Sequence, residues 1–229
     1  MLFAIKNRLG PTLLLAVVLG TAAVAARAML GLTWQVEQRL DLAWAVLLGG
    51  VVIAASDGLL HLLLLRTGDR YLTCYRALLE YFRPQKAPQI LAGGLLAAVE
   101  ELAFRGVLLE GLRTLADLPA LAAVAVTAFV FGLFHLIPRR SLWPFTVWAA
   151  WEGALLGYVY VLSESLLVSC VVHALHDVVG FSLIAFQRRT GWLMGNAPGG
   201  DPIVVGACDP QATEPSPGVQ RMVKADPRA

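Results

Sequence analysis

Six long apolar runs are the feature of this 229-residue sequence that most restricts its fold. Each run approaches or exceeds the ~20 mostly apolar residues that a helix needs to cross a bilayer. Lipid offers the backbone no hydrogen-bond partner, so these runs must pair their backbone groups internally, which favours helices over strands. The sequence therefore predicts an all-α, polytopic transmembrane bundle of about six spans, at residues 11–32, 43–65, 88–112, 119–137, 142–162 and 166–186.

The composition agrees with a membrane protein and excludes other classes. Hydrophobic residues make up 58% of the chain and charged residues 15%, against ~25% charged in soluble domains. A net charge of +2 gives no basic footprint for nucleic acid, so no nucleic-acid partner is expected. The three cysteines form no CxxC pair, which argues against a disulfide framework or a thiolate metal site. The expected surroundings are membrane lipid.

The distribution of basic residues predicts the orientation in the membrane. With a cytoplasmic N-terminus, 14 of the 18 basic residues fall in cytoplasmic segments. Arg27, Arg39 and Arg113 then lie in outside loops, and Arg105 lies within a span. Because cytoplasmic loops of membrane proteins are enriched in Lys and Arg, we expect both termini in the cytoplasm. The composition suggests a bacterial inner membrane. The cytoplasmic set is Lys6, Arg8, Arg66, Arg70, Arg76, Arg83, Lys86, Arg139, Arg140, Arg188, Arg189, Arg221, Lys224 and Arg228.

Three regions differ in character along the chain. Residues 1–86 hold the first two spans and a basic cytoplasmic loop, and residues 87–189 hold spans that carry polar groups. Residues 190–229 are rich in Gly and Pro, which predicts a disordered cytoplasmic tail. A signal peptide is an alternative interpretation of the first run, because basic residues precede it and its alanine-rich stretch near residues 22–28 could be cleaved. Its apolar continuation to Leu32 favours a span.

The third run carries three ionisable residues, each of which costs ~2.5–3.5 kcal/mol at mid-membrane on insertion scales. Arg105 follows Glu101 by four residues, one helical turn, so the two can neutralise each other. We interpret them as a structural ion pair. Glu100 points about 100° away from Glu101 on the helix and is left without that partner.

The fourth and sixth runs add histidines at the same spacing. Phe131 and His135 are four residues apart, as are His173 and Asp177. One polar cavity that holds Glu100, His135 and His173 is simpler than a separate partner for each. His135 lies near the cytoplasmic end of its run and the other two lie nearer mid-span, so we expect a water-accessible cavity in the cytoplasmic half.

Other polar residues in the runs receive no role from sequence alone. Asp57 and His61 in the second run are interpreted as local hydrogen-bonding groups, and His176, three residues from His173, as a bystander. Glu152 is interpreted as a residue that reaches water at the membrane interface. Intramembrane acids also occur in ion pathways, so a small transporter is an alternative, but the chain has no pair of similar halves.

The polar residues form three motifs in chain order, EExxxR at Glu100 to Arg105, FxxxH at Phe131 to His135, and HxxxD at His173 to Asp177. With these motifs, residues 88–186 resemble the CPBP family, which includes type II CAAX prenyl endopeptidases and bacteriocin-immunity proteins. The resemblance implies an intramembrane endopeptidase that cleaves a membrane-associated substrate, a prenylated protein or a peptide precursor. A non-proteolytic immunity or scaffold protein of the same fold is the alternative.

The resemblance also implies roles for the motif residues. Glu100 would be the general base for water, a role worth ~10²–10⁴-fold in rate. His135 would hold the water, and His173 would donate to the developing oxyanion. Glu101 and Arg105 would support them, together with Phe131.

Two features leave the chemistry open. Glu100, His135 and His173 can also supply three zinc ligands with an open fourth position. No HExxH motif is present, and a metal-free mechanism is favoured. Prenyl endopeptidases of the family usually carry Asn at the position of Asp177. An ionised Asp177 cannot donate to an oxyanion but can orient His173.

Overall fold

The computed structural model describes residues 8–32, 41–82, 86–137 and 140–190. All of them belong to one compact unit, residues 1–196. Within these ranges the regular structure is helical and includes no strand, so the predicted all-α class is confirmed. The predicted disordered tail, apart from its first residue, lies outside the described residues.

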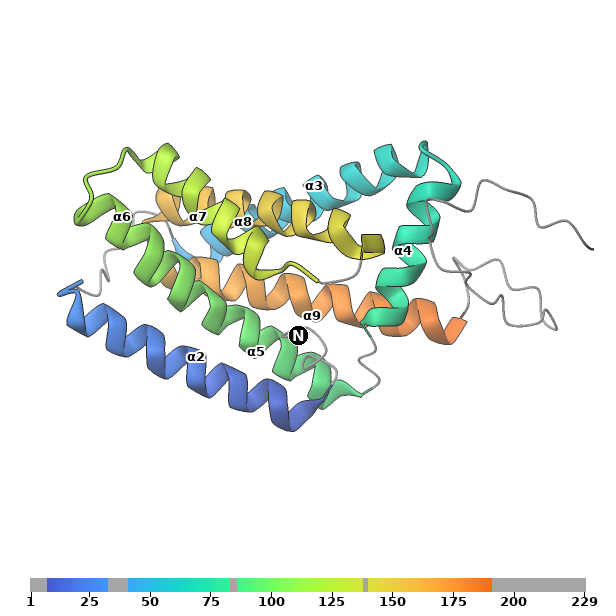
Figure 1. The fold of residues 1–229 in the computed structure, drawn as a ribbon, viewed down its shortest axis with the longest axis horizontal. Helices are drawn as coiled ribbons and strands as arrows, with labels where there is room; N and C mark the ends of the chain where they lie inside the picture. The colour runs from blue at the N-terminus through green and yellow to red at the C-terminus, as the bar shows by residue number, and fades with distance from the viewer. Residues whose placement is uncertain (1–7, 33–40, 83–85, 138–139, 191–229) are drawn as a thin grey trace, which may run out of the picture. The chain divides into compact units, whose positions relative to one another are not determined.

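The helices coincide with the predicted runs to within a few residues. Four of them, α2, α3, α8 and α9, are long and apolar enough to cross a membrane, and α7 is a shorter apolar helix. The third predicted span is helical throughout, but it consists of α5, a π-helix and α6 in succession. The elements in chain order are α2 (Leu9–Met29), α3 (Leu42–Leu65), α4 (Asp69–Tyr81), α5 (Ala87–Ala103), the π-helix η1 (Phe104–Leu109), α6 (Glu110–Thr114), α7 (Ala120–Phe134), the 3-10 helix η2 (Arg140–Leu142), α8 (Trp143–Ser163) and α9 (Leu166–Thr190) (Figure 1).

Local sequence explains several helix ends. The side chain of Asp41 accepts hydrogen bonds from the backbone amides of the first turn of α3, as a good N-cap does. A proline occupies the first turn of α5 and of α8, where its missing N–H has no cost. Between α8 and α9 the chain turns at Glu164, whose φ is +50°.

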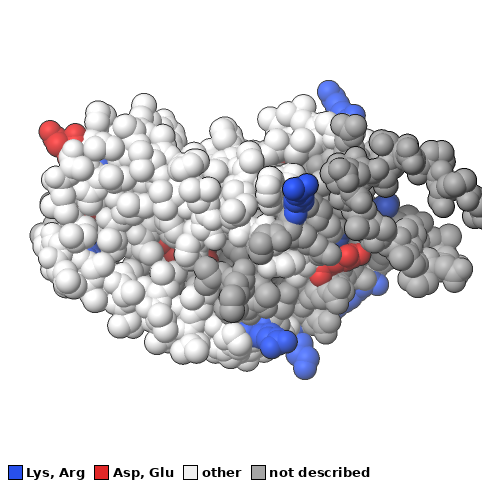
Figure 2. Space-filling model, viewed as in Figure 1, with Lys and Arg blue, Asp and Glu red and all other residues white. Residues whose placement is uncertain are grey.

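The outer surface of the helices is apolar, in contrast to that of a soluble protein. Large hydrophobic side chains on all four long helices are more than half exposed, among them Val17, Val51, Leu62, Val147 and Phe186. Figure 2 shows a broad uncharged surface, with Lys and Arg side chains gathered toward the side of the view where α4 lies. The apolar exterior and the four long apolar helices identify an integral membrane protein.

The helices that carry the polar motifs are brought together because α5 packs between α2 and α9, and α7 packs on α8 (Figure 1). Two consecutive glycines allow α5 and α9 to approach closely. A Cβ on Gly93 would lie 2.6 Å from the Phe181 ring, and one on Gly94 would lie 2.6 Å from Val178 and 3.0 Å from the Ala174 carbonyl oxygen. Small residues at such crossings are typical of membrane helices.

The basic loop at 66–86 contains a helix, α4, that the sequence analysis did not predict. Tyr71 and Tyr75 on α4 stack on each other and pack on the ring of His61 at the end of α3. The Tyr75 hydroxyl also donates to Gln187 Oε1 on α9, at 2.9 Å. Burial, with a smaller contribution from Tyr75, raises the pKa of Tyr71 to about 12. The Tyr71 hydroxyl therefore stays neutral well above physiological pH. Through the ring contacts with His61 and the hydrogen bond to Gln187, α4 connects α3 to α9.

Candidate active site

Glu101 is the centre of a buried polar cluster between α5 and α9. Its Oε1 atom accepts a hydrogen bond from Arg105 Nη1 at 2.8 Å and lies 2.7 Å from His173 Nδ1. The Glu101 and Arg105 side chains are completely buried, and Arg105 Nη2 donates to the Gly153 carbonyl on α8 at 2.6 Å. The ion pair expected from the four-residue spacing is present, and it also anchors His173, which the spacing did not reveal.

The π-helix η1 begins directly after α5 and contains Arg105. A wider helical turn of this kind leaves backbone carbonyls available to other partners, and π-turns are frequent at functional sites. Here the Gly106 carbonyl accepts a hydrogen bond from Arg27 Nη1 on α2. Arg27 is buried in the last turn of α2, so its assignment to an outside loop was wrong. Its guanidinium is instead drawn inward by this carbonyl.

His135 follows the last residue of α7 and faces Glu100. His135 Nδ1 lies 2.8 Å from the carbonyl oxygen of Phe131. A carbonyl only accepts, so Nδ1 carries a proton, and in the neutral ring Nε2 then presents a lone pair. That Nε2 atom lies 3.8 Å from Glu100 Oε2. Both side chains are buried, so the carboxylate and the basic nitrogen face each other away from bulk solvent.

Phe131 holds the two motif histidines in place. Its ring centroid lies 4.2 Å from that of His135 and 5.8 Å from that of His173. The Arg105 guanidinium carbon lies 5.0 Å from the same centroid, within the range of cation–π attraction. A Cβ at Gly153 would come within 3.0 Å of this ring, so glycine there leaves room for it.

Asp177 lies beside the motif histidine as its spacing predicted. Its Oδ1 atom is 4.0 Å from His173 Nε2 and 3.6 Å from His176 Nδ1. The structure thus brings Glu100 to His135, and Glu101 and Asp177 to His173.

Residues 83–179 match the family model described as Type II CAAX prenyl endopeptidase Rce1-like. This Rce1-like segment contains all three motifs, so the predicted resemblance is confirmed there, and the match supports a CAAX-type protease in general. No curated protein and no solved structure showed a match. Helices α2 and α3 lie outside the segment.

The motif residues of the Rce1-like segment are of the types that activate water in hydrolases, either directly or through a bound zinc ion. His135 and His173 each engage Nδ1, with the Phe131 carbonyl and with Glu101, and each directs Nε2 toward a carboxylate, that of Glu100 and that of Asp177. Two imidazoles and a carboxylate are ligand types that zinc accepts, but among the described residues the ligand atoms of Glu100, His135 and His173 do not all lie within 4.8 Å of one another. The contact from Glu101 to His173 is of the kind that orients zinc-bound histidines. The same atoms can instead hold water directly.

Asp57, Glu152 and His176, which received no role from the sequence, lie in contact with one another around the His176 ring. His176 Nε2 lies 2.7 Å from Asp57 Oδ2, and His176 Nδ1 lies 2.9 Å from Glu152 Oε1. Glu152 is buried in the middle of α8, so the expectation that it reaches interface water was wrong. Its central position in the run at 142–162 was the signal that could have identified it.

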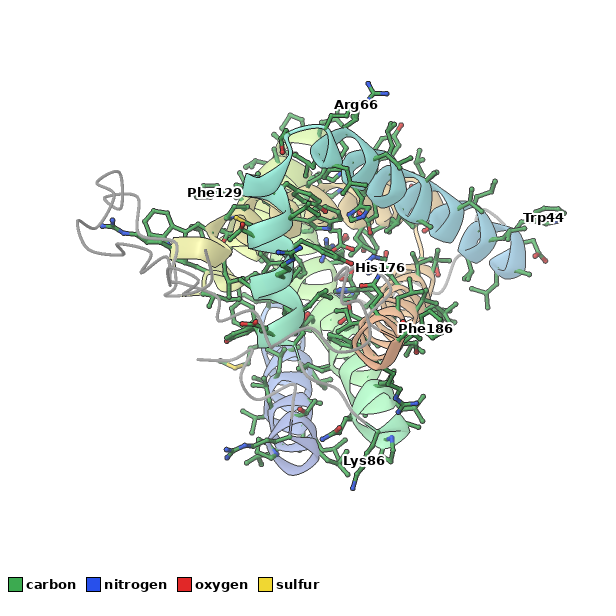
Figure 3. All side chains as sticks on the ribbon, turned by 90° about the vertical axis from the view of Figure 1, so that its right-hand side faces the viewer. Trp44, Arg66, Lys86, Phe129, His176 and Phe186 are labelled. Carbon is green, nitrogen blue, oxygen red and sulfur yellow. The ribbon has the colours of Figure 1, made fainter. Side chains whose placement is uncertain are left out.

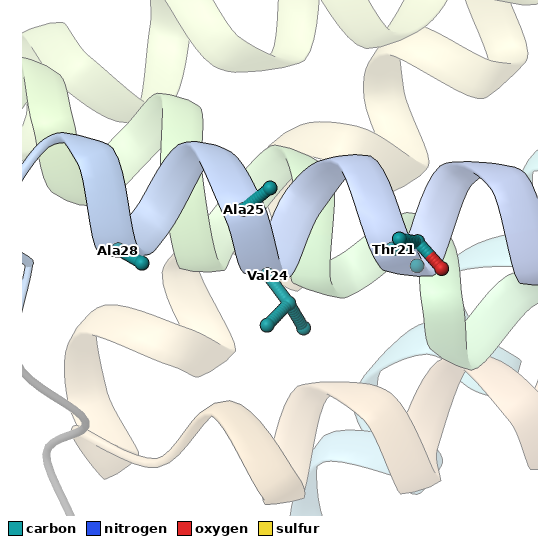
Figure 4. Close-up of a pocket in the computed structure, with 5 residues that line it drawn as sticks. Thr21, Val24, Ala25 and Ala28 are labelled. Carbon is teal, nitrogen blue, oxygen red and sulfur yellow. The ribbon is translucent and has the colours of Figure 1, made fainter.

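A hollow beside α2 lies apart from these clusters. Figure 4 shows its lining, in which the side chains are small or apolar, from Gly20, Thr21, Val24, Ala25 and Ala28. None of them is titratable, so the hollow is not a candidate for peptide hydrolysis.

Proposed function

We propose that this chain is an intramembrane endopeptidase that hydrolyses a peptide bond of a membrane-associated substrate, a prenylated protein or a peptide precursor. The observation that carries the proposal is the approach of Glu100 Oε2 to His135 Nε2, at 3.8 Å, within the Rce1-like segment. A carboxylate and an unprotonated imidazole nitrogen at this separation can both accept hydrogen bonds from one water molecule.

Glu100 acts as the general base in this proposal. As the water oxygen forms its bond to the carbonyl carbon of the substrate, Glu100 takes the water proton. His135 Nε2 accepts the other proton of that water in a hydrogen bond and fixes the direction of attack. Glu100 then returns its proton to the departing amine as the C–N bond breaks. Such acid–base transfer contributes ~10²–10⁴-fold to the rate.

His173 stabilises the oxyanion. Its Nδ1–H is directed to Glu101 Oε1, so a second proton on Nε2 makes the ring a cationic donor toward the former carbonyl oxygen. The carboxylates of Glu101, 2.7 Å from Nδ1, and of Asp177, 4.0 Å from Nε2, favour that cation, while Arg105 offsets the charge of Glu101. One well-placed donor of this kind is worth about 10²–10³-fold in other hydrolases.

Zinc held by Glu100, His135 and His173 is the alternative form of the same site. It would supply Lewis-acid activation of water and of the carbonyl. Metal analysis of protein dialysed against chelator separates the two forms. Activity that resists chelation supports Glu100 as the base. Stoichiometric zinc that is lost in both His135→Ala and His173→Ala, together with activity, would replace the glutamate mechanism and leave the peptidase assignment standing.

The decisive variant is Glu100→Gln, which keeps the size of the side chain but removes the base. Cleavage of a reporter peptide by detergent-solubilised protein should fall by ~10²-fold or more, at normal membrane levels. A neutral amide is easier to hold in a membrane than a carboxylate, so the fold should persist. Glu164→Gln, the same chemical change at the turn after α8, is the matched control and should retain activity.

The rival function is a non-proteolytic immunity or scaffold protein, which needs only the shape of the bundle. Complementation of a deletion strain separates the two. Full complementation by Glu100→Gln at normal levels would contradict the peptidase proposal. Loss of complementation by Glu100→Gln, His135→Ala and His173→Ala, with loss of cleavage, supports it.

We also propose a bacterial inner-membrane location with both termini in the cytoplasm. The gathering of basic side chains toward α4 (Figure 2) supports this orientation through the positive-inside rule. Alkaline phosphatase fused after Arg189 should be inactive, and the same enzyme fused after Leu115 should be active. Strong activity of the Arg189 fusion would reverse the orientation.

A further inference from the structure

A second histidine–carboxylate cluster joins three helices next to the candidate active site. Asp57 comes from α3, Glu152 from α8 and His176 from α9. One potential ligand atom from each lies within 4.8 Å of the other two. In Figure 3, His176 lies toward the middle of the bundle, whereas Arg66 and Lys86 are at its edge. None of the three residues belongs to the motifs used above.

The contacts of this cluster are incompletely satisfied. Glu152 Oε1 lies 2.9 Å from His176 Nδ1, yet neither atom has a hydrogen-bond partner of good geometry among the described residues, and Asp57 Oδ1 has none either. The Glu152 side chain is nine-tenths buried and directed into the cluster. Ligands on one tetrahedral zinc ion, at bonds of ~2.0–2.2 Å, lie about 3.3–3.6 Å apart, so an ion bound by one nitrogen of His176 requires only a small separation of these side chains. Asp57 Oδ1 and Glu152 Oε1 are buried oxygens that such an ion would engage.

The charge balance points the same way. Two carboxylates surround His176, and Asp177 Oδ1 approaches the same ring at 3.6 Å. Among the described residues, the ion pairs of Asp57 and Glu152 are those with His176. Arg105 is engaged elsewhere, because its guanidinium binds Glu101 and the Gly153 carbonyl. A protonated His176 balances only one of the two carboxylates. A buried carboxylate without a compensating cation is costly, and a divalent ion would balance both Asp57 and Glu152.

We propose that Asp57, Glu152 and His176 bind one divalent transition-metal ion of the zinc type. An imidazole ligand favours such ions over magnesium and calcium, and the three residues leave further positions for water. The site is separate from Glu100 and His135 and does not rest on the proposed peptidase activity. It would fasten α3, which lies outside the Rce1-like segment, to α8 and α9 within it.

The test uses the purified full-length protein in detergent, loaded with zinc chloride and then dialysed. Elemental analysis should find about one zinc per chain in the wild type. Asp57→Asn, Glu152→Gln and His176→Gln should each reduce that amount at least ~10-fold. His61→Gln, one turn along α3 from Asp57, is the matched control and should keep the ion. His135→Ala and His173→Ala should also keep it.

Wild-type measurements keep the proposal falsifiable if the variants fail to fold. Cobalt should give visible absorption bands that zinc removes and magnesium does not, and zinc should raise the melting temperature. A wild type that binds no stoichiometric zinc or cobalt would overturn the proposal and leave His176 as a cation between two carboxylates. Zinc that persists in His176→Gln but disappears in His135→Ala would also overturn it, and would place the metal at the candidate active site.

Discussion

His173 and His176 are three residues apart on α9, yet their surroundings differ in charge. The cluster around His173 includes its own cation, Arg105, and the Glu101–Arg105 pair is completely buried. The cluster around His176 has two carboxylates and no such arginine partner, and the His176 and Asp57 side chains are 23% and 18% exposed. The difference teaches that a permanent counter-charge accompanies full burial here, whereas the cluster whose charges are not balanced in this way is partly exposed.

The largest expected effect is the removal of the permanent counter-charge. Arg105→Ala leaves Glu101 buried without its partner, which costs about 3–5 kcal/mol. We expect a severe loss of folded protein, measured as the monodisperse fraction in size-exclusion chromatography and as melting temperature. The double variant Glu101→Gln, Arg105→Gln removes both charges and should recover part of the yield. If Arg105→Ala melts like the wild type, the contrast between the clusters has no energetic basis.

An intermediate effect is expected at Asp177, which faces both histidines. Asp177→Ala removes the charge that orients His173, and kcat/KM for peptide cleavage should fall by about 10-fold, or ~1.4 kcal/mol. Asp177→Asn keeps the shape and gains a donor for the oxyanion, so its kcat/KM should stay within a few-fold of the wild type. Equal kcat/KM for the wild type, Asp177→Ala and Asp177→Asn would show that Asp177, which lies between the two clusters, has no catalytic role.

The smallest expected effect concerns Arg27, a buried cation outside both clusters. Arg27→Met removes the donor to the Gly106 carbonyl, and a buried acceptor left unsatisfied costs ~1–3 kcal/mol. The melting temperature should fall while cleavage per folded molecule is unchanged. Arg113→Met is the control, because its pair with Glu110 is longer, at 3.7 Å, and partly exposed, which makes it worth ~0–1 kcal/mol. Equal melting temperatures for the two variants would contradict this ranking.

The sequence predicted the helices well because lipid permits few alternatives. The run at 43–65 became α3 at Leu42–Leu65, with no tertiary information required. The pairing of Glu101 with Arg105 was also predictable, since residues four apart share one face of a helix. Contacts along one helix can therefore be predicted from the spacing of its residues.

What the sequence did not predict lies between helices or within an atypical helix. Helix α4 is amphipathic and lies in a charged loop, so an analysis based on long apolar runs passed over it. The contact of His176 with Asp57 joins residues 119 positions apart, and spacing along one helix contains no information about it. The same holds for His173 and Glu101, which depend on the close crossing of α5 and α9 that glycines permit.

The length of α7 has a consequence for the lipid around the protein. Its 15 residues rise about 22 Å, less than the ~30 Å of a typical hydrocarbon core. Its outward side chains, among them Leu121, Phe129 and Leu133, are large and apolar, so they match a layer thinner than the surrounding bilayer. Such hydrophobic mismatch is relieved by local thinning of the membrane. Headgroups and water would then reach deeper beside α7, and a lipid-anchored peptide would have a shorter path to His135 at the end of this helix.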